Sequence, residues 1–194
     1  MTNKFKEFFI KENYPMKGKI FNAQEVQAIL AGNKTMFREV IKPQPKKDVL
    51  EYTADRVNLL DKCPYQVGQK IFCKERLFND GDQFFYDDED GTILDKKDEK
   101  FWERNCSKHT IPAKNCPQWA SRLTLLIKEI RVERLDLISD KDALKEGCFY
   151  EGGCEVPRIS FKMDWNATHK KPEEKWEANP WIWVINFEVV NANK

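Results

Sequence analysis

The chain has 194 residues, of which 41% are hydrophobic and 12% aromatic, so it is long and apolar enough for one domain with a real core. This composition excludes a globally disordered chain. Charged residues make up 34% of the chain, yet the formal net charge is only +1. The segment Asp80–Glu103 carries ten acids and three lysines, a local charge of −7, so the rest of the chain carries +8. A basic body with one acidic excursion is compatible with a polyanionic partner.

Several other classes are not expected from the sequence. The first residues are not followed by the apolar stretch of a signal peptide. No apolar run has the length of a membrane span. We therefore expect a cytoplasmic protein with no membrane partner. The six cysteines include no CxxC pair and are expected to be reduced thiols. Cys106, His109 and Cys116 match no strong zinc template, so we expect neither a metal nor a cofactor.

The first predicted element is a short helix that follows an N-terminal arm. Residues 1–15 are polar and aromatic without a clean period and are interpreted as that arm. Asn22 and Glu25 have the spacing of a capping box. Apolar residues then recur at helical spacing, at Val26, Ile29 and Leu30. Gly32 is expected to end the helix.

Extended segments are predicted in the next part of the chain. They are Thr35–Ile41, Lys70–Arg76 after a turn at Tyr65–Gly68, and a hairpin of Gln83–Tyr86 with Thr92–Leu94 around Gly91. Two further segments are expected to be irregular. Lys96–Glu103 is expected to be charged and mostly solvated, and Pro112–Pro117 to be a loop.

Arg122–Leu135 is the strongest strand pattern of the sequence. Leu123, Leu125 and Ile127 alternate on one face, after which Ile130 and Val132 continue the apolar pattern on the other parity. A slip of one residue inside a strand is the mark of a β-bulge, and barrels bend at bulges. We therefore predict a bulge in this strand.

The last third of the chain is predicted to hold a short helix and a closing strand. Ser139 and Asp142 mark the helix start and Gly147 its end. Residues 147–176 are expected to form a long loop or flap. Apolar residues then alternate through the last strand, at Trp181, Trp183, Ile185, Phe187 and Val189. The predicted fold is α+β, a small, strongly bent mixed barrel with two or three short helices and an inserted acidic hairpin.

The candidate chemistry centres on Lys34 and Glu146. If the fold brings them together, they form an acid–base pair in a basic cleft, which suits recognition or hydrolysis of a nucleotide-like ligand. A role of Lys34 as a base requires burial to lower its pKa. Both residues also have ordinary interpretations, as a solvated loop lysine and as an exposed glutamate at the unfavourable end of a helix.

Other residues are expected to flank the same cleft. Arginine binds phosphates through its bidentate fork, and a tryptophan can stack on a base. Ordinary ion pairs or core positions are the alternatives for each of them. The flanking candidates are Arg38, Lys74, Trp119, Arg122 and Arg131. Lys74 and Glu75 point to opposite faces of one strand, so one of the two is expected to point inward and to need a partner.

Four blocks together resemble the ASCH-domain family of the PUA-like superfamily, especially its larger phage-encoded members. The blocks lie between about residue 16 and residue 190, in the same order as in that family. Their sequences are AILAGNKTMFREVIKPQP, YQVGQKIFCKE, WASRLTLLIKEIRVERLDLISDKDALKEG and WEANPWIWVINFEVV. The resemblance implies a single PUA-like domain over residues 16–190, with insertions at about 79–117 and 148–176.

The resemblance also implies a cleft that binds RNA or a modified nucleoside. Some small bacterial members are amidohydrolases that remove the acetyl group of N4-acetylcytidine with a lysine, a threonine and a glutamate. The lysine falls on Lys34 and the glutamate on Glu146. The threonine falls on Phe37, which has no hydroxyl to act as a nucleophile. Thr35 lies two residues away, about 6–7 Å along an extended chain.

Three hypotheses follow. The first is a binding module for RNA or a modified nucleoside, in a cleft lined by Lys34, Thr35, Arg38, Lys74, Glu75, Trp119 and Arg122 together with Glu146. The second is a hydrolase of the N4-acetylcytidine amidohydrolase or ribonuclease type, with Lys34 and Glu146 as catalytic residues and water as the nucleophile. The third is a phage protein whose acidic segment 80–103 binds a host protein.

Overall fold

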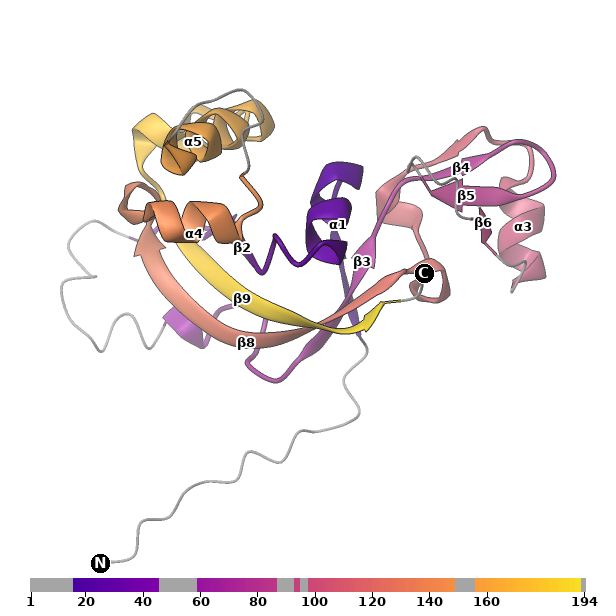
Figure 1. Cartoon of the computed structure of the whole chain (residues 1–194), viewed down its shortest axis with the longest axis horizontal. Helices are drawn as coiled ribbons and strands as arrows, with labels where there is room; N and C mark the ends of the chain where they lie inside the picture. Colours follow the sequence, from indigo (N-terminus) through magenta and orange to yellow (C-terminus); the bar gives the residue numbers. More distant parts are fainter. Residues whose placement is uncertain (1–15, 46–58, 87–92, 95–97, 149–155, 193–194) are drawn as a thin grey trace, which may run out of the picture.

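The computed structural model describes residues 16–45, 59–86, 93–94, 98–148 and 156–192. These residues form two sheets and several short helices, which confirms the predicted α+β class. Figure 1 shows two long strands, β8 and β9, curving side by side through the molecule. Helices α4 and α5 lie toward one end of this curved pair, and the second sheet lies toward the other end. The predicted N-terminal arm lies outside the described residues.

The larger sheet has five strands in the order β1-β3-β8-β9-β2. β1 is parallel to β3 and the other neighbours are antiparallel, so the sheet is mixed, as predicted. Its strands are β1 (Lys17–Ile20), β2 (Met36–Val40), β3 (Lys70–Lys74), β8 (Leu123–Arg134) and β9 (Trp181–Ala192).

The predicted bulge lies in β8. Ile127 pairs with Phe187 and Glu129 pairs with Asn186, so Lys128 is an extra residue on this strand. Apolar residues on both sides of the bulge reach the same core cluster, namely Leu123, Leu125 and Ile127 before it and Ile130 and Val132 after it. The bulge therefore keeps one apolar face directed inward along a strand that bends.

The two edges of the larger sheet approach each other. β1 and β2 are the end strands of the hydrogen-bonded order. An ion pair joins them, with the Lys19 ammonium 2.5 Å from the Glu39 carboxylate. Tyr65 also donates a hydrogen bond to Glu39, at 2.9 Å. The sheet therefore bends as predicted, and side chains rather than a described strand ladder join its edges.

Both faces of β9 are buried over its first half. The odd-numbered residues from Trp181 to Phe187 pack in the interior of the bent sheet, with residues of α1 (Ala23–Leu30). Ile182 and Val184 pack on the other face, in a second cluster with residues of α4 (Asp140–Lys145) and α5 (Pro157–Thr168). The predicted alternation thus describes one face, and the helices explain why the other face is apolar too.

The predicted caps of α1 and α4 are confirmed. The Asn22 side chain accepts a hydrogen bond from the Glu25 amide, and Glu25 accepts one from the Asn22 amide. The Ser139 side chain accepts from the amide of Asp142. Gly32 and Gly147 follow the two helices with φ of 75° and 82°, the left-handed region that glycine adopts without strain.

The expectation of a long loop over residues 147–176 is wrong for its described part. Residues 157–168 form α5, followed by the 3₁₀ turns Pro172–Glu174 and Trp176–Ala178. No side chain caps the start of α5, so a usual sequence signal for a helix is missing there. The helix is instead held by burial of Phe161 and Trp165, one turn apart.

The smaller sheet has the order β6-β5-β4-β7. Its strands are β4 (Leu77–Asn79), β5 (Phe84–Tyr86), β6 (Ile93–Leu94) and β7 (Thr110–Ile111). The predicted pairing of the hairpin is confirmed for β5 and β6, while its turn at Gly91 lies outside the described residues. The 3₁₀ turns Ala113–Asn115, Gln118–Ala120 and Leu135–Leu137 connect neighbouring elements.

The segment expected to be solvated before β7 is partly a helix. Residues 99–105 form α3 (Glu99–Asn105), capped by the Asp98 side chain. Phe101 is buried in a third core cluster with residues of the smaller sheet, because it meets Phe84 and Trp119 edge-on. One aromatic residue in a charged segment is therefore enough to dock this helix.

Within the residues that the structure describes, no helix is long and apolar enough to cross a membrane.

Candidate functional site: a cavity beside a buried ion-pair cluster

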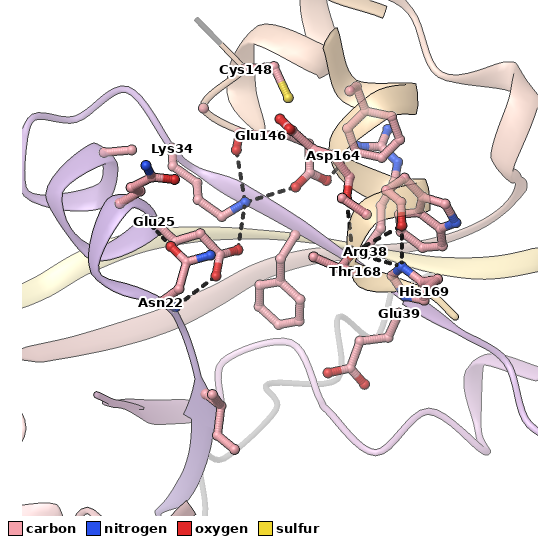
Figure 2. Close-up of a pocket in the computed structure, with 18 of the residues that line it drawn as sticks. Asn22, Glu25, Lys34, Arg38, Glu39, Glu146, Cys148, Asp164, Thr168 and His169 are labelled. Carbon is pink, nitrogen blue, oxygen red and sulfur yellow. Dashed lines mark hydrogen bonds and ion pairs between the residues drawn. The ribbon is translucent and has the colours of Figure 1, made fainter. Parts of the chain in front are cut away.

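Lys34 and Glu146 meet in the structure, as Figure 2 shows. The Lys34 ammonium lies 3.0 Å from the Glu146 carboxylate and donates a second hydrogen bond to the Glu146 carbonyl, at 2.8 Å. Both residues are buried, with exposures of 4% and 9%. The structure thus brings together two residues separated by 112 positions in the chain.

The backbone fixes this encounter. Lys34 and Glu146 form an isolated β-bridge, and the amide of Thr35 donates to the carbonyl of Lys145 at 2.8 Å. Gly147 lies in the contact, where an added Cβ would be 3.2 Å from the Ala28 Cβ and 3.3 Å from the Lys34 Cβ. A glycine is therefore required twice, for its positive φ and for the close approach of the two segments.

Arg38 extends the pair into a cluster. Its guanidinium lies 2.6 Å from the second oxygen of Glu146 and 3.4 Å from Asp142. Asp142 also binds Arg131, at 3.0 Å. Glu146 therefore receives one cation on each carboxylate oxygen. The Arg38 Nε atom is buried and has no hydrogen-bond partner among the described residues.

This cluster forms part of the wall of a cavity of about 720 Å³. The volume is within the usual range for small-molecule sites. The cavity lies where the sheet edges β1 and β2 approach each other, between α1 and α5. Its polar and titratable lining residues include Lys19, Glu25, Lys34, Arg38, Glu39, Lys42, Glu146, Cys148, Asp164, Thr168, His169 and Glu174.

The cavity lining is not basic, contrary to the expectation of a basic cleft. Among the described lining residues, four side chains are cationic and five are carboxylates. The carboxylates include Glu146 and Glu25, which both contact Lys34, and Glu39, which contacts Lys19. The basic excess of the sequence outside its acidic segment therefore does not collect in this cavity.

The Lys34 side chain is a protonated ammonium and has no free electron pair with which to act as a base. Burial lowers the pKa of Lys34, but the charges of Glu146 and Glu25 together outweigh it, so the net pKa is raised. The condition for a neutral lysine base, a lowered pKa, is not met. The nearby Cys148 thiol is also unreactive, because burial and the Glu146 charge raise its pKa to about 12.

α5 supplies the wall that the sequence did not reveal. Asp164 lines the cavity, and burial raises the pKa of its carboxyl although the Lys34 charge lowers it. The His169 ring stacks on Trp165, with ring centroids 3.8 Å apart, and its Nδ1 lies 3.0 Å from the Trp165 carbonyl. Burial lowers the pKa of His169, which favours the neutral ring.

Of the predicted site residues, Thr35 and Arg131 are absent from the described cavity lining, Arg131 being paired with Glu129, Glu133 and Asp142. Four others lie farther away. Glu75 and Arg122 form a separate buried pair at the junction of the two sheets, with 2.6 Å between Nη2 and Oε2. Of Lys74 and Glu75, the glutamate is thus the inward residue with a partner. Lys74 donates to the Lys114 carbonyl at 2.7 Å, and Trp119 packs edge-on against Phe101. The described cavity lining includes none of these four residues, which corrects the expectation of one shared cleft.

Phe37 has no hydroxyl, and Thr35 does not line the cavity within the described residues. Phe37 is 3% exposed, and its ring contacts the rings of Phe21, Tyr65 and Phe187 in the core. It borders the cavity as an apolar surface. Thr35 is not among the described lining residues, and its backbone is used in the sheet, where its carbonyl accepts from the Phe187 amide.

The cysteines and histidines form no metal centre among the described residues. Cys116 belongs to the core of the smaller sheet, whereas His109 is exposed beside it. The five described cysteines, at positions 63, 73, 106, 116 and 148, are free thiols.

No family model and no curated protein matches the sequence. Among solved structures there are likenesses, which include the following two. Protein EF3133 from Enterococcus faecalis V583, which carries the family designation DUF984, is 8% identical, with a TM-score of 0.48 over 94% of this chain and 85% of that chain. The ASCH domain from Lactobacillus crispatus JV V101 is 13% identical, with a TM-score of 0.40 over 91% of this chain and 80% of that chain.

An ASCH domain, the family that the four sequence blocks resemble, is therefore among the solved structures similar to this chain. At these identities and TM-scores, neither neighbour's ligand nor any residue role is carried over to this chain.

Proposed function

We propose that the protein binds a nucleobase, in RNA or in a modified nucleoside, in the cavity beside Lys34, Arg38 and Glu146. The observation that supports this proposal most directly is the cluster itself. Two buried cations and one carboxylate, fixed by ion pairs of 3.0 and 2.6 Å, border a cavity of about 720 Å³. Such a site offers both donors and acceptors to a polar ring.

The charge balance of the cavity favours a base over a phosphate. With five carboxylates among its described lining residues, the cavity opposes the entry of an anion. A nucleobase is uncharged and carries hydrogen-bond donors and acceptors on its edge. The apolar surface of Phe37 suits the face of such a ring.

Hydrolysis is the second candidate, and one observation favours it. An ammonium and a carboxylate in contact at a cavity wall can stabilise an oxyanion and carry a proton. Lys34 would act as the fixed charge and Glu146 as the proton carrier, with water as the nucleophile. The raised pKa of Lys34 argues against its use as a base, which is why binding is the first proposal.

The test is calorimetric titration of the full chain with cytidine and N4-acetylcytidine as probes. We expect saturable binding of at least one of them. Lys34→Met should weaken it about tenfold or more, because a hydrogen bond to a charged group contributes about 1.5–3 kcal/mol. Lys128→Met is the matched control, since Lys128 is an exposed lysine paired with Glu188 and lies outside the described cavity lining.

Two results would overturn the proposal. One is no binding of either nucleoside at millimolar concentration by a chain whose fold is intact by circular dichroism. The other is equal binding by the Lys34 and Lys128 variants. Release of acetate from N4-acetylcytidine, lost in Glu146→Gln, would move the assignment from binding to hydrolysis.

A further inference from the structure

The cations of this site form two groups, one buried and one exposed to solvent, and only the exposed group can bind a new anion at little cost. Lys34 and Arg38 are buried, with side-chain exposures of 4% and 0%, and both are bound to Glu146. Removing a buried cation from its carboxylate leaves an uncompensated charge in a poorly solvated place. These two cations therefore stay paired with Glu146 and are poor partners for an incoming phosphate.

The second group is exposed. The side chains of Lys42 and Lys171 are 61% and 65% exposed and lie near the same oxygen of Glu174, at 2.6 and 3.8 Å. Lys42 and Glu174 line the cavity, and Lys171 reaches its rim through Glu174. One carboxylate thus faces two ammonium groups, so these three side chains together carry a positive charge.

The two ammonium groups are open to solvent, whereas the Glu174 side chain is only 11% exposed. A phosphate oxygen can bind either lysine from the solvent side while Glu174 keeps the other lysine as its partner. His169 lies close to these charges: burial is the main cause of its lowered pKa, the Glu174 charge raises this pKa, and the Lys42 and Lys19 charges lower it. The site is therefore positive at its rim and lined by a majority of carboxylates inside.

We propose that the occupant of the cavity is one base of a single-stranded nucleic acid, whose phosphates lie on Lys42 and Lys171 at the rim. This inference rests on the proposed function and adds a partner and a surface to it. The carboxylates inside the cavity repel the phosphates of the nucleic-acid backbone, and the lysines at the rim attract them. A strand placed this way turns one base inward and keeps its phosphates in water, where lysine contacts are made with little desolvation.

The test compares strands with a nucleoside on the full chain. Short fluorescent RNA and DNA oligonucleotides of one cytidine-rich sequence are titrated by anisotropy over a series of salt concentrations, and cytidine and N4-acetylcytidine are titrated by calorimetry. For the wild type we expect at least one strand to bind more tightly than the nucleosides, with an affinity that falls as salt rises.

The double variant Lys42→Ala with Lys171→Ala should lose strand affinity by a larger factor than it loses nucleoside affinity, because Lys42 also lines the cavity. Its salt slope should be shallower by about 1.4, because each phosphate contact on a single strand contributes about 0.7. The matched control is Lys70→Ala with Lys128→Ala, which removes the same charge from exposed residues of β3 and β8 outside the described cavity lining.

The outcomes separate this inference from the proposed function. If the nucleosides bind but neither strand binds more tightly, or if both double variants lose the same strand affinity, the rim assignment is overturned and the proposed function stands. If neither the nucleosides nor the strands bind, both fail. Loss of strand affinity in the Lys42 and Lys171 double variant but not in the control supports the rim assignment, and whichever of the RNA and DNA oligonucleotides binds more tightly then identifies the strand.

Discussion

The molecule has two buried groups of ion pairs, which consist of the same kinds of side chain but lie in different surroundings. Lys34, Glu146 and Arg38 border a cavity, whereas Glu75 and Arg122 are enclosed at the junction of the two sheets. Arg122 binds both oxygens of Glu75, and its guanidinium lies 4.1 Å from the centre of the Tyr86 ring. A buried charge is therefore a candidate for function only when it also borders a space that a ligand can enter.

The largest effect is expected from breaking the enclosed pair. Glu75→Gln replaces the carboxylate that holds two nitrogens of the buried Arg122 guanidinium by a neutral amide, which should lower the free energy of unfolding by about 3–5 kcal/mol. Urea denaturation followed by tryptophan fluorescence measures this change. The double variant Glu75→Met with Arg122→Met is the control and should recover most of the loss. A single variant as stable as the wild type would contradict the structural role given to this pair.

A smaller loss of stability is expected at the cavity. Glu146→Gln removes the carboxylate between Lys34 and Arg38, but Glu25 remains 3.5 Å from Lys34 and Asp142 remains 3.4 Å from Arg38. We expect a loss of about 1–3 kcal/mol in the free energy of unfolding, together with weaker binding of the nucleosides that the wild type binds. Glu188→Gln, on the exposed pair with Lys128, is the control and should cost less than about 1 kcal/mol.

If Glu146→Gln destabilised the protein as much as Glu75→Gln and left nucleoside binding intact, the contrast between the two groups would be lost.

The smallest effect concerns pH. Because the folded pKa of Lys34 is raised above 10.5, its charge contributes stability that is fully present below pH 10.5 and is lost as pH rises through the folded pKa. The difference in free energy of unfolding between the wild type and Lys34→Met should therefore shrink above pH 10.5. The same difference for Arg122→Met should stay constant, since arginine keeps its proton. Equal behaviour of the two variants would contradict this assignment.

The sequence was sufficient for the elements whose signals are local. The capping residues of α1 and α4 and the phase slip of β8 each fix a feature within a few residues, and all three are confirmed. Local signals of this kind do not depend on the rest of the fold. The encounter of Lys34 with Glu146 was considered only as a condition and through the family resemblance, because a contact across 112 positions has no local signal.

The wall formed by α5 depended on contacts that the sequence does not display. The helix has no side-chain cap and follows a glycine-containing stretch, so its pattern resembled a loop. Two signals were present, Pro157 at its first turn and the pair Phe161 and Trp165 at helical spacing. These signals predict a helix only once it is known that Ile182 and Val184, on the far face of β9, must be buried by another element.

The assignment of charged residues to one cleft failed for a related reason. Strand periodicity shows that Glu75 or Lys74 points inward, but a bent sheet packed on both faces has more than one interior. Which of these interiors receives Glu75 follows from the junction with the smaller sheet, whose Tyr86 lies over Arg122. The smaller sheet, which lies between β3 and β8 in the chain, therefore borders the place that part of the predicted site occupies.

The extra residue Lys128 has a consequence for evolution by insertion and deletion. Because Lys128 is bulged out of the ladder, Ile127 and Glu129 pair with consecutive residues of β9, and Arg131 keeps the side from which it reaches Asp142. Deleting Lys128 would leave this pairing and the side of Arg131 unchanged. A one-residue insertion in β8 that was not bulged would instead turn Arg131 toward the apolar interior and withdraw a cation from Asp142, the neighbour of Arg38. The bulge thus lets the strand change its length by one residue while the charges beside the cavity keep their places.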